Sequence, residues 1–101
     1  MTEDGPVRLE VRNPSGLHAR PAALFVRTAG GYGAEISVRN LTRAGEPANA
    51  KSILAVLGLG VSRGHEIEIS ARGDDAARAV AGLRELVESG IGEAIDPADP
   101  G

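Results

Sequence analysis

The sequence predicts an α+β fold in which helices cover one face of a mainly antiparallel sheet. Short segments in which apolar and polar residues alternate indicate strands that are buried on one face. Two longer segments suit helices, and the order of the segments lacks the repeated strand–helix–strand units of a parallel sheet. The 101 residues fit one domain, which we place at 7–93 between an N-terminal tail (1–6) and a disordered C-terminal tail (94–101).

The first half of the chain predicts a strand, a helix and a second strand. Residues 7–11 alternate between apolar and charged side chains, and the turn formers of 13–16 end this strand. A helix is expected over 19–29, with Pro21 in the first turn, where a missing amide hydrogen bond costs nothing. Residues 34–38 alternate again and predict the second strand.

The second half predicts a short strand, a short helix and a longer strand. The polar segment 40–46 indicates a hairpin loop, after which a short strand is expected over about 47–50. Ser52 is a suitable N-cap for an apolar helix over 53–57. Residues 67–71 alternate with polar neighbours and form the clearest strand in the chain.

The last helix has the clearest periodicity and begins at Ala76. Asp75 suits the positive end of its dipole, and Gly90 marks its end. One face of this helix is apolar at a spacing of three or four residues: Ala76, Val80, Leu83 and Val87. The core must be mainly aliphatic, because Phe25 and Tyr32 are the only aromatic residues.

Composition and charge argue against several classes of protein. A net charge of −3 and the scarcity of aromatic residues argue against nucleic-acid binding. Cysteine is absent, so neither a disulfide nor a thiolate metal site is expected. No apolar run approaches the roughly 20 residues that span a bilayer, and the acidic N-terminus lacks the apolar segment of a secretory signal. We therefore expect a cytoplasmic protein with no membrane insertion, no metal and no cofactor.

One segment, 15–22, combines groups that suit a phosphoryl site. His18 lies between a glycine turn and a helix start, and neutral imidazole is a good nucleophile whose phosphoryl adduct is labile. The amides and the dipole at the start of the helix attract an anion, and the planar guanidinium of Arg20 matches phosphate oxygens. The alternative is a capping histidine beside a solvated arginine, and the spacing alone does not decide between the two.

Two separate segments carry a resemblance to a known family. Residues 16–22 (GLHARPA) closely resemble the active-site signature of HPr, the histidine phosphocarrier of the phosphoenolpyruvate-dependent sugar phosphotransferase system. Residues 50–61 resemble the second signature of that family, around its regulatory serine and second helix, and 64–71 are similar to its fourth strand. The resemblance covers roughly 7–93, nearly the whole chain.

The resemblance implies both a fold and a reaction. The fold would be an open-faced β-sandwich of order β-α-β-β-α-β-α, with a four-stranded antiparallel sheet and three helices on one side. His18 would accept phosphate on Nδ1 from phospho-enzyme I and pass it to an enzyme IIA for sugar uptake. Arg20, Ala19 and Pro21 would stabilise the phosphoryl group. The protein would be a stoichiometric carrier instead of an enzyme, and we expect a monomer, since a shuttle must leave each partner quickly.

The short apolar helix cannot bury all of its side chains on its own sheet. We expect Ile53 and Val56 in the core, whereas the resemblance implies that Leu54 and Leu57 form an exposed docking patch beside His18. Three basic residues would form the rim of this patch and attract acidic partners: Arg27, Lys51 and Arg63.

Other interpretations remain open on the sequence alone. Ser52 is either an N-cap or, as in some relatives, the target of a serine kinase and phosphorylase, which would make the chain a regulatory docking protein for a transcriptional regulator. The segment 40–46 is longer than the usual HPr hairpin and resembles HPr-like modules of a dihydroxyacetone kinase phosphotransferase subunit or other multidomain phosphotransferases. An unrelated α+β interaction domain is the third alternative. His65 lacks neighbouring ligands and is expected at the surface.

Overall fold

The computed structural model of the protein describes residues 2–95 and contains the elements that the sequence predicts, in the predicted order. These elements are β1 (Glu3–Glu10), α1 (Ala19–Gly30), β2 (Glu35–Asn40), β3 (Ala48–Asn49), α2 (Ile53–Gly58), β4 (Glu66–Arg72) and α3 (Ala76–Glu88). The predicted tail 94–101 lies outside the described residues from position 96 on.

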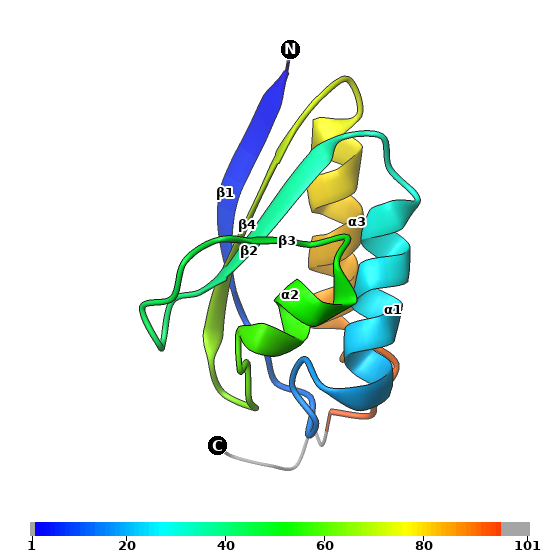
Figure 1. Ribbon diagram of the computed structural model, residues 1–101. Coiled ribbons are helices and arrows are strands. Elements are labelled where there is room, and N and C mark those ends of the chain that lie inside the picture. The colour runs from blue at the N-terminus through cyan, green and yellow to red at the C-terminus, as the bar shows by residue number, and fades with distance from the viewer. Residues whose placement is uncertain (1, 96–101) are drawn as a thin grey trace.

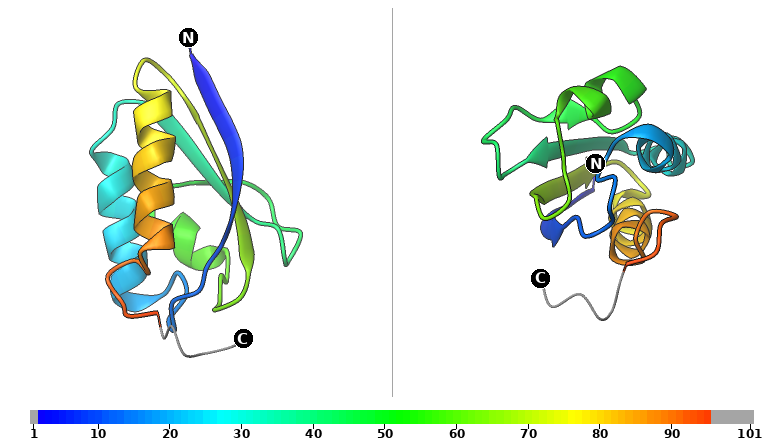
Figure 2. Two further views of the ribbon diagram at one scale, coloured as in Figure 1. Left: turned by 180° about the vertical axis from the view of Figure 1, so that it is seen from behind. Right: turned by 90° about the horizontal axis from the view of Figure 1, so that it is seen from below.

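The four strands form one sheet with the spatial order β1-β4-β2-β3, and every neighbouring pair is antiparallel. β4 lies at the centre, where Ile69 pairs with Val7 of β1 on one side and with Val38 of β2 on the other. Helices α1 and α3 run side by side in opposite directions over one face of the sheet, and α2 lies next to α1 (Figures 1 and 2). This arrangement confirms the predicted open-faced sandwich.

The core lies between the sheet and the helices and is almost entirely aliphatic. In β4 the residues Ile67, Ile69 and Ala71 are buried, as their alternation predicts, while Phe25 of α1 is fully buried against them in the same core. All four residues of the apolar face predicted for α3 are buried: Ala76, Val80, Leu83 and Val87. Burial of one valine, leucine, isoleucine or phenylalanine side chain stabilises the fold by about 1.5–3 kcal/mol, so the apolar faces of the helices hold them on the sheet.

The predicted N-terminal tail is wrong for residues 3–6, because β1 begins at Glu3 and not at Val7. Glu3 and Asp4 pair with Arg72 and Ala71 of β4, and the register shifts between Asp4 and Val7. The alternation of apolar and polar residues in β1 is broken at this irregularity, although β1 continues to pair with β4 before it. The alternation therefore predicted only the part of the strand from Val7 on. None of the helices in the described part of the chain is long and apolar enough to cross a membrane.

Asp75 supports the fold in a way that its position before α3 does not reveal. It is the N-cap residue of α3, but its carboxylate makes no cap hydrogen bond. Instead it accepts hydrogen bonds from the backbone N–H groups of Gly33 and Ala34, each at 2.8 Å. The bond from Gly33 is the main cause that lowers the pKa of Asp75 below its usual value, and the bond from Ala34 adds to it against the opposing effect of desolvation. The carboxylate thus joins the α1–β2 connection to the start of α3.

Replacement of this carboxylate is expected to change how stability depends on pH. Because the pKa of Asp75 is lowered by folding, its stabilisation is complete above the unfolded pKa of about 3.9 and is lost as the pH falls through the folded value. Asp75→Asn should therefore unfold at lower urea concentration at neutral pH and lose less stability on acidification than the wild type. Asp74→Asn is the matched control, and equal acid sensitivity of the wild type and Asp75→Asn would contradict the assignment.

Candidate functional site

The loop before α1 fixes the position of His18. Leu17 is fully buried, and its backbone N–H donates to the carbonyl of Val61 at 3.0 Å. Gly16 has a φ of +58° and lies so close to this segment that a Cβ atom would overlap the Val61 carbonyl oxygen and lie 2.9 Å from Cα of Ser62. The chain then leaves the core at His18, which is half-buried and is the N-cap of α1 with extended backbone (φ −129°, ψ 162°).

The imidazole of His18 is available for chemistry. Within residues 2–95 neither of its nitrogens makes a hydrogen bond, although the residue occupies the N-cap position. The amides of Ala19 and Arg20 have no carbonyl one helical turn before them, and Pro21 has no amide hydrogen. Ala22 is the first residue whose N–H donates within the turn, to the carbonyl of His18 at 3.5 Å. The N–H groups of Ala19 and Arg20, which directly follow His18 in the chain, therefore have no partner inside α1, at the positive end of its dipole.

Arg20 and Ala19 complete the site. Arg20 is exposed, and in the described part of the chain its guanidinium has no hydrogen bond or ion pair. Ala19 has a φ of +52°, in the left-handed region that costs a residue with a Cβ atom about 1–2 kcal/mol. This conformation at Ala19 could not be predicted from the neighbouring residues. Pro21 is buried in the first turn, as predicted.

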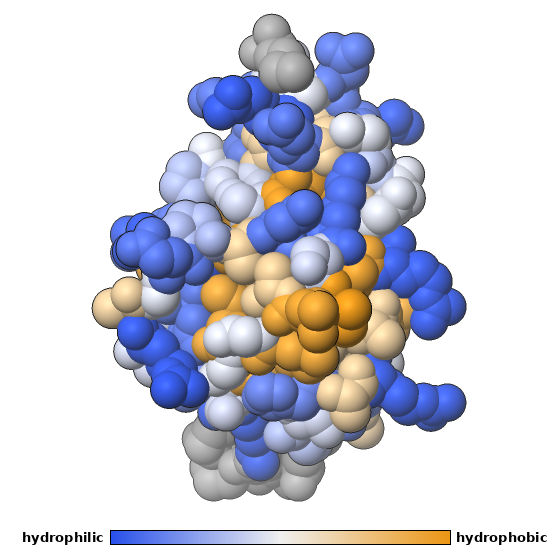
Figure 3. Space-filling model, viewed as in Figure 1, coloured by the Kyte–Doolittle hydropathy of each residue, from blue (hydrophilic) through white to orange (hydrophobic). Residues whose placement is uncertain are grey.

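Helix α2 exposes the apolar patch that the sequence suggested. Leu54 is 79% exposed and Leu57 37%, whereas Val56 is fully buried. The expectation that Ile53 is a core residue is wrong, since it is 40% exposed. A helix of six residues directs only one narrow side to the core, and Val56 occupies it. Ile53, Leu54 and Leu57 form what we call the α2 patch, and Figure 3 shows the apolar surface gathered over this region.

The three basic residues expected around the α2 patch do not lie together. Arg27 is in the last turn of α1, about 13 Å along the helix from His18 at 1.5 Å per residue. The ammonium group of Lys51 donates to the carbonyl of Tyr32 at 2.6 Å, which also places it near the C-terminal end of α1. Arg63 is exposed in the segment after Val61 that pairs with the loop before His18. Of the three, Arg63 is therefore the residue whose segment borders the His18 loop.

Two further residues have structural roles. The hydroxyl of Ser52 accepts a hydrogen bond from the N–H of Ala55 at 3.2 Å, which confirms the predicted N-cap of α2. His65 is partly exposed, and its Nδ1 accepts a hydrogen bond from the N–H of Ser62 at 3.1 Å and lies 3.2 Å from Nδ2 of Asn40. Both contacts stiffen the segment against which the His18 loop packs.

A carboxylate that the sequence did not reveal holds the His18 loop. Glu93 accepts hydrogen bonds from the Asn13 side chain and from both the backbone and the hydroxyl of Ser15. Gly90 marked the end of α3, but no local pattern could show where the chain would go next.

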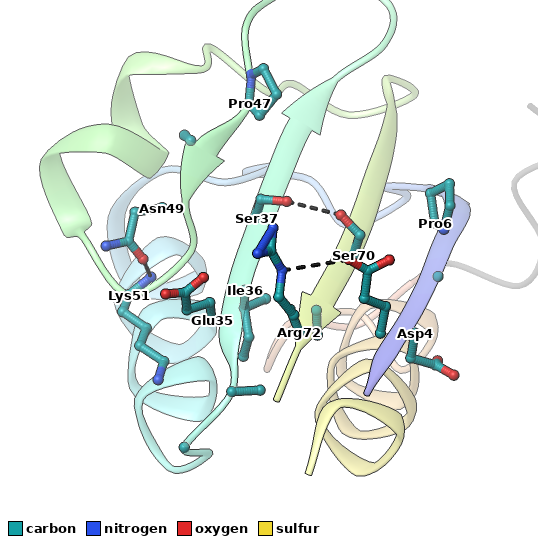
Figure 4. Close-up of a pocket in the computed structure, with 16 residues that line it drawn as sticks. Asp4, Pro6, Glu35, Ile36, Ser37, Pro47, Asn49, Lys51, Ser70 and Arg72 are labelled. Atoms are coloured by element: carbon teal, nitrogen blue, oxygen red, sulfur yellow. Dashed lines mark hydrogen bonds and ion pairs between the residues drawn. The ribbon is translucent and has the colours of Figure 1, made fainter. Parts of the chain in front are cut away.

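A shallow groove of about 710 Å³ lies elsewhere, on the face of the sheet away from α1 and α3 (Figure 4). Ser37 and Ser70 meet in it with their hydroxyls 2.9 Å apart, and Arg72 forms an ion pair with Glu3 at 3.5 Å. His18 does not line this groove. The reactive groups gather instead at the exposed start of α1.

Comparisons with known proteins show the family to which the chain belongs. Residues 7–89 match the family model described as "PTS HPr component phosphorylation site". The chain belongs to the HPr family. It is 42% identical over 86 residues to phosphocarrier protein HPr of Streptomyces coelicolor, covering 85% of this chain and 90% of that one. A crystal structure of HPr from Thermoanaerobacter tengcongensis has a TM-score of 0.83 at 45% identity, covering 93% of this chain and 99% of that one.

Larger proteins also contain this module. The chain is 42% identical over 83 residues to the multiphosphoryl transfer protein of Salmonella typhimurium. The aligned residues cover 82% of this chain and 22% of that protein. The chain thus spans about a fifth of the length of such relatives.

The close approach of Gly16 to Val61 yields a prediction about stability. Gly16→Ala places a Cβ atom against the Val61 carbonyl at positive φ and should lower the free energy of unfolding by about 2 kcal/mol or more, measured by urea denaturation. Gly30→Ala is the control, since a Cβ at Gly30 meets no atom within 4 Å and α1 should lose no stability. Equal stability of Gly16→Ala and the wild type would contradict the close packing of this loop.

Proposed function

We propose that His18 is the residue that carries the phosphoryl group, taken from phospho-enzyme I and passed to an enzyme IIA for sugar uptake. The observation that supports this most strongly is the arrangement at the start of α1. His18 has a half-buried imidazole that makes no hydrogen bond within residues 2–95. It is followed in the chain by two amides that have no partner inside α1 and by an arginine side chain that is unpaired within the same residues. A site of this kind attracts a dianionic phosphoryl group and leaves the nucleophile free to react.

The reaction moves one phosphoryl group from phospho-enzyme I to His18. In the neutral form the Nδ1 lone pair of His18 attacks phosphorus, and the bond between phosphorus and its donor atom on enzyme I breaks. The electron pair of that bond stays on the donor atom, and the proton released from the His18 imidazole balances the proton that the donor group takes up. No oxidation or reduction occurs. The guanidinium of Arg20 and the amides of Ala19 and Arg20 would hold the phosphoryl oxygens, with Pro21 fixing the turn beneath them.

We propose that the protein is a stoichiometric carrier that acts in the cytoplasm. The reactive groups lie on an open surface, so the second half of each reaction site must come from the partner. The α2 patch would be the docking surface, because exposed leucines beside a charged centre are suited to a partner interface. Arg63 would attract acidic partners, and Arg27 and Lys51 would act at the far side of the patch.

Two additions concern the context of the module. The match to multiphosphoryl transfer proteins favours, as a second candidate, a role inside or beside a larger phosphotransferase, where the phosphoryl acceptor differs. We further propose that Ser52, at the N-terminus of α2 next to the α2 patch, is a site where phosphorylation would regulate docking. A phosphate there would add up to about two negative charges to a surface that must bind partners.

The first test is transfer of phosphate from phosphoenolpyruvate in the presence of a bacterial enzyme I. The wild type should acquire one acid-labile phosphate, and His18→Ala should acquire none while keeping its circular dichroism spectrum. His65→Gln, which alters the other histidine of the chain, should be labelled like the wild type. Label on folded His18→Ala, or none on the wild type with a cognate enzyme I, would refute the assignment.

The second test concerns docking through the α2 patch. Leu54→Glu places a charge at a side chain that is 79% exposed, so it should not unfold the protein but should raise the KM for enzyme I about tenfold with kcat unchanged. Ala77→Glu adds the same charge at an exposed position of α3 and should leave KM unaltered. Equal KM values for the two variants would show that partners bind elsewhere.

A further inference from the structure

Glu93 contacts the loop that positions His18 with both oxygens of its carboxylate. Oε1 accepts a hydrogen bond from Nδ2 of Asn13 at 3.0 Å and another from the backbone N–H of Ser15 at 2.9 Å. Oε2 accepts one from the hydroxyl of Ser15 at 2.8 Å. These bonds lower the pKa of Glu93 below its usual value, with the bond from Asn13 as the largest cause, so the carboxylate is ionised at neutral pH.

Asn13 connects Glu93 to the backbone of the loop that precedes His18. Its side chain is fully buried, and Nδ2 also donates to the carbonyl of Gly16 at 3.0 Å. Its Oδ1 is buried with no hydrogen-bond partner in the structure, so the amide is held by its donated bonds alone. Loss of Glu93 would remove one of these two bonds. The loop would then be held mainly from the other side, by the bond from Leu17 to Val61.

The turn after α3 brings Glu93 to the loop by an unusual route. Gly90, Ile91 and Gly92 all have positive φ, of +98°, +49° and +78°. For a β-branched residue such as Ile91 this conformation is a true outlier, and it is kept by full burial of the side chain and by its N–H bond to the carbonyl of Leu86 at 3.0 Å. The N–H of Glu93 then closes the turn on Gly90 at 2.9 Å. Strained backbone that is fixed in this way points to a function of the residue it directs.

We propose that Glu93 is a positioning residue for phosphoryl transfer, which holds the Asn13–Gly16 segment so that His18 stays in its reactive geometry. This inference rests on the proposed role of His18. Glu93 lies beyond the segment 7–89 that matches the family model. A misplacement of about 1 Å at a reacting group can cost up to about a hundredfold in rate, so even a partial release of the loop is measurable.

The test compares three variants as substrates of enzyme I at saturating phosphoenolpyruvate. Glu93→Ala should lower kcat about tenfold and leave KM within about twofold, because the α2 patch is untouched. Glu93→Gln should restore most of kcat, since its amide oxygen can accept from Asn13 and the Ser15 N–H while its amino group donates to the Ser15 hydroxyl. Glu88→Ala removes an exposed carboxylate of α3 and should leave both constants unchanged.

Hydrogen exchange gives a readout that is independent of transfer. The Ser15 amide should be protected in the wild type and exchange faster in Glu93→Ala. A wild-type kcat for Glu93→Ala, or an unprotected Ser15 amide in the wild type, would overturn the proposal. So would a kcat deficit that disappears at a lower temperature, which would reflect lost stability. If the wild type takes no phosphate, the proposed function and this role both fall, and exchange at Ser15 then reports only the structural contact.

Discussion

The placement of His18 depends on the burial of Leu17, the residue directly before it. Leu17 lies in the core with an exposed fraction of zero, and its amide is bonded to Val61 in the segment that leads to β4. Removal of this side chain from the core would cost about 2–5 kcal/mol, so the backbone at position 17 cannot drift. The next residue must then leave the core at the start of α1, which places its side chain beside the amides of that helix.

The site combines a rigid base with an exposed reactive surface. Gly16, Leu17 and Pro21 pack against the fold, while His18 is half-buried and Arg20 is exposed. The proposed carrier role, in which one phosphoryl group is presented to two partners, needs both properties. The packed residues beneath the site keep the imidazole oriented without a bound substrate. The open surface lets a partner supply the rest of the reaction site.

The chemistry and its support come from different parts of the chain. The reactive groups lie within a few consecutive residues, and a helix start brings them together whatever the rest of the fold does. Their support comes from Val61 after α2 and from Glu93 after α3, which only the folded chain places beside the loop. The chemistry of the site can therefore be inferred from a local motif, whereas its support depends on the whole fold.

The sequence by itself determined the order of elements, the apolar face of α3 and the cap at Ser52. Each of these depends on residues that are neighbours in the chain or in one helix, so periodicity and turn chemistry reveal them. Only the tertiary structure decided that β1 begins at Glu3, that Ile53 is exposed and that Glu93 meets Asn13 and Ser15. These outcomes depend on pairings between distant segments and on how much of a short helix the core can cover, which no local pattern encodes.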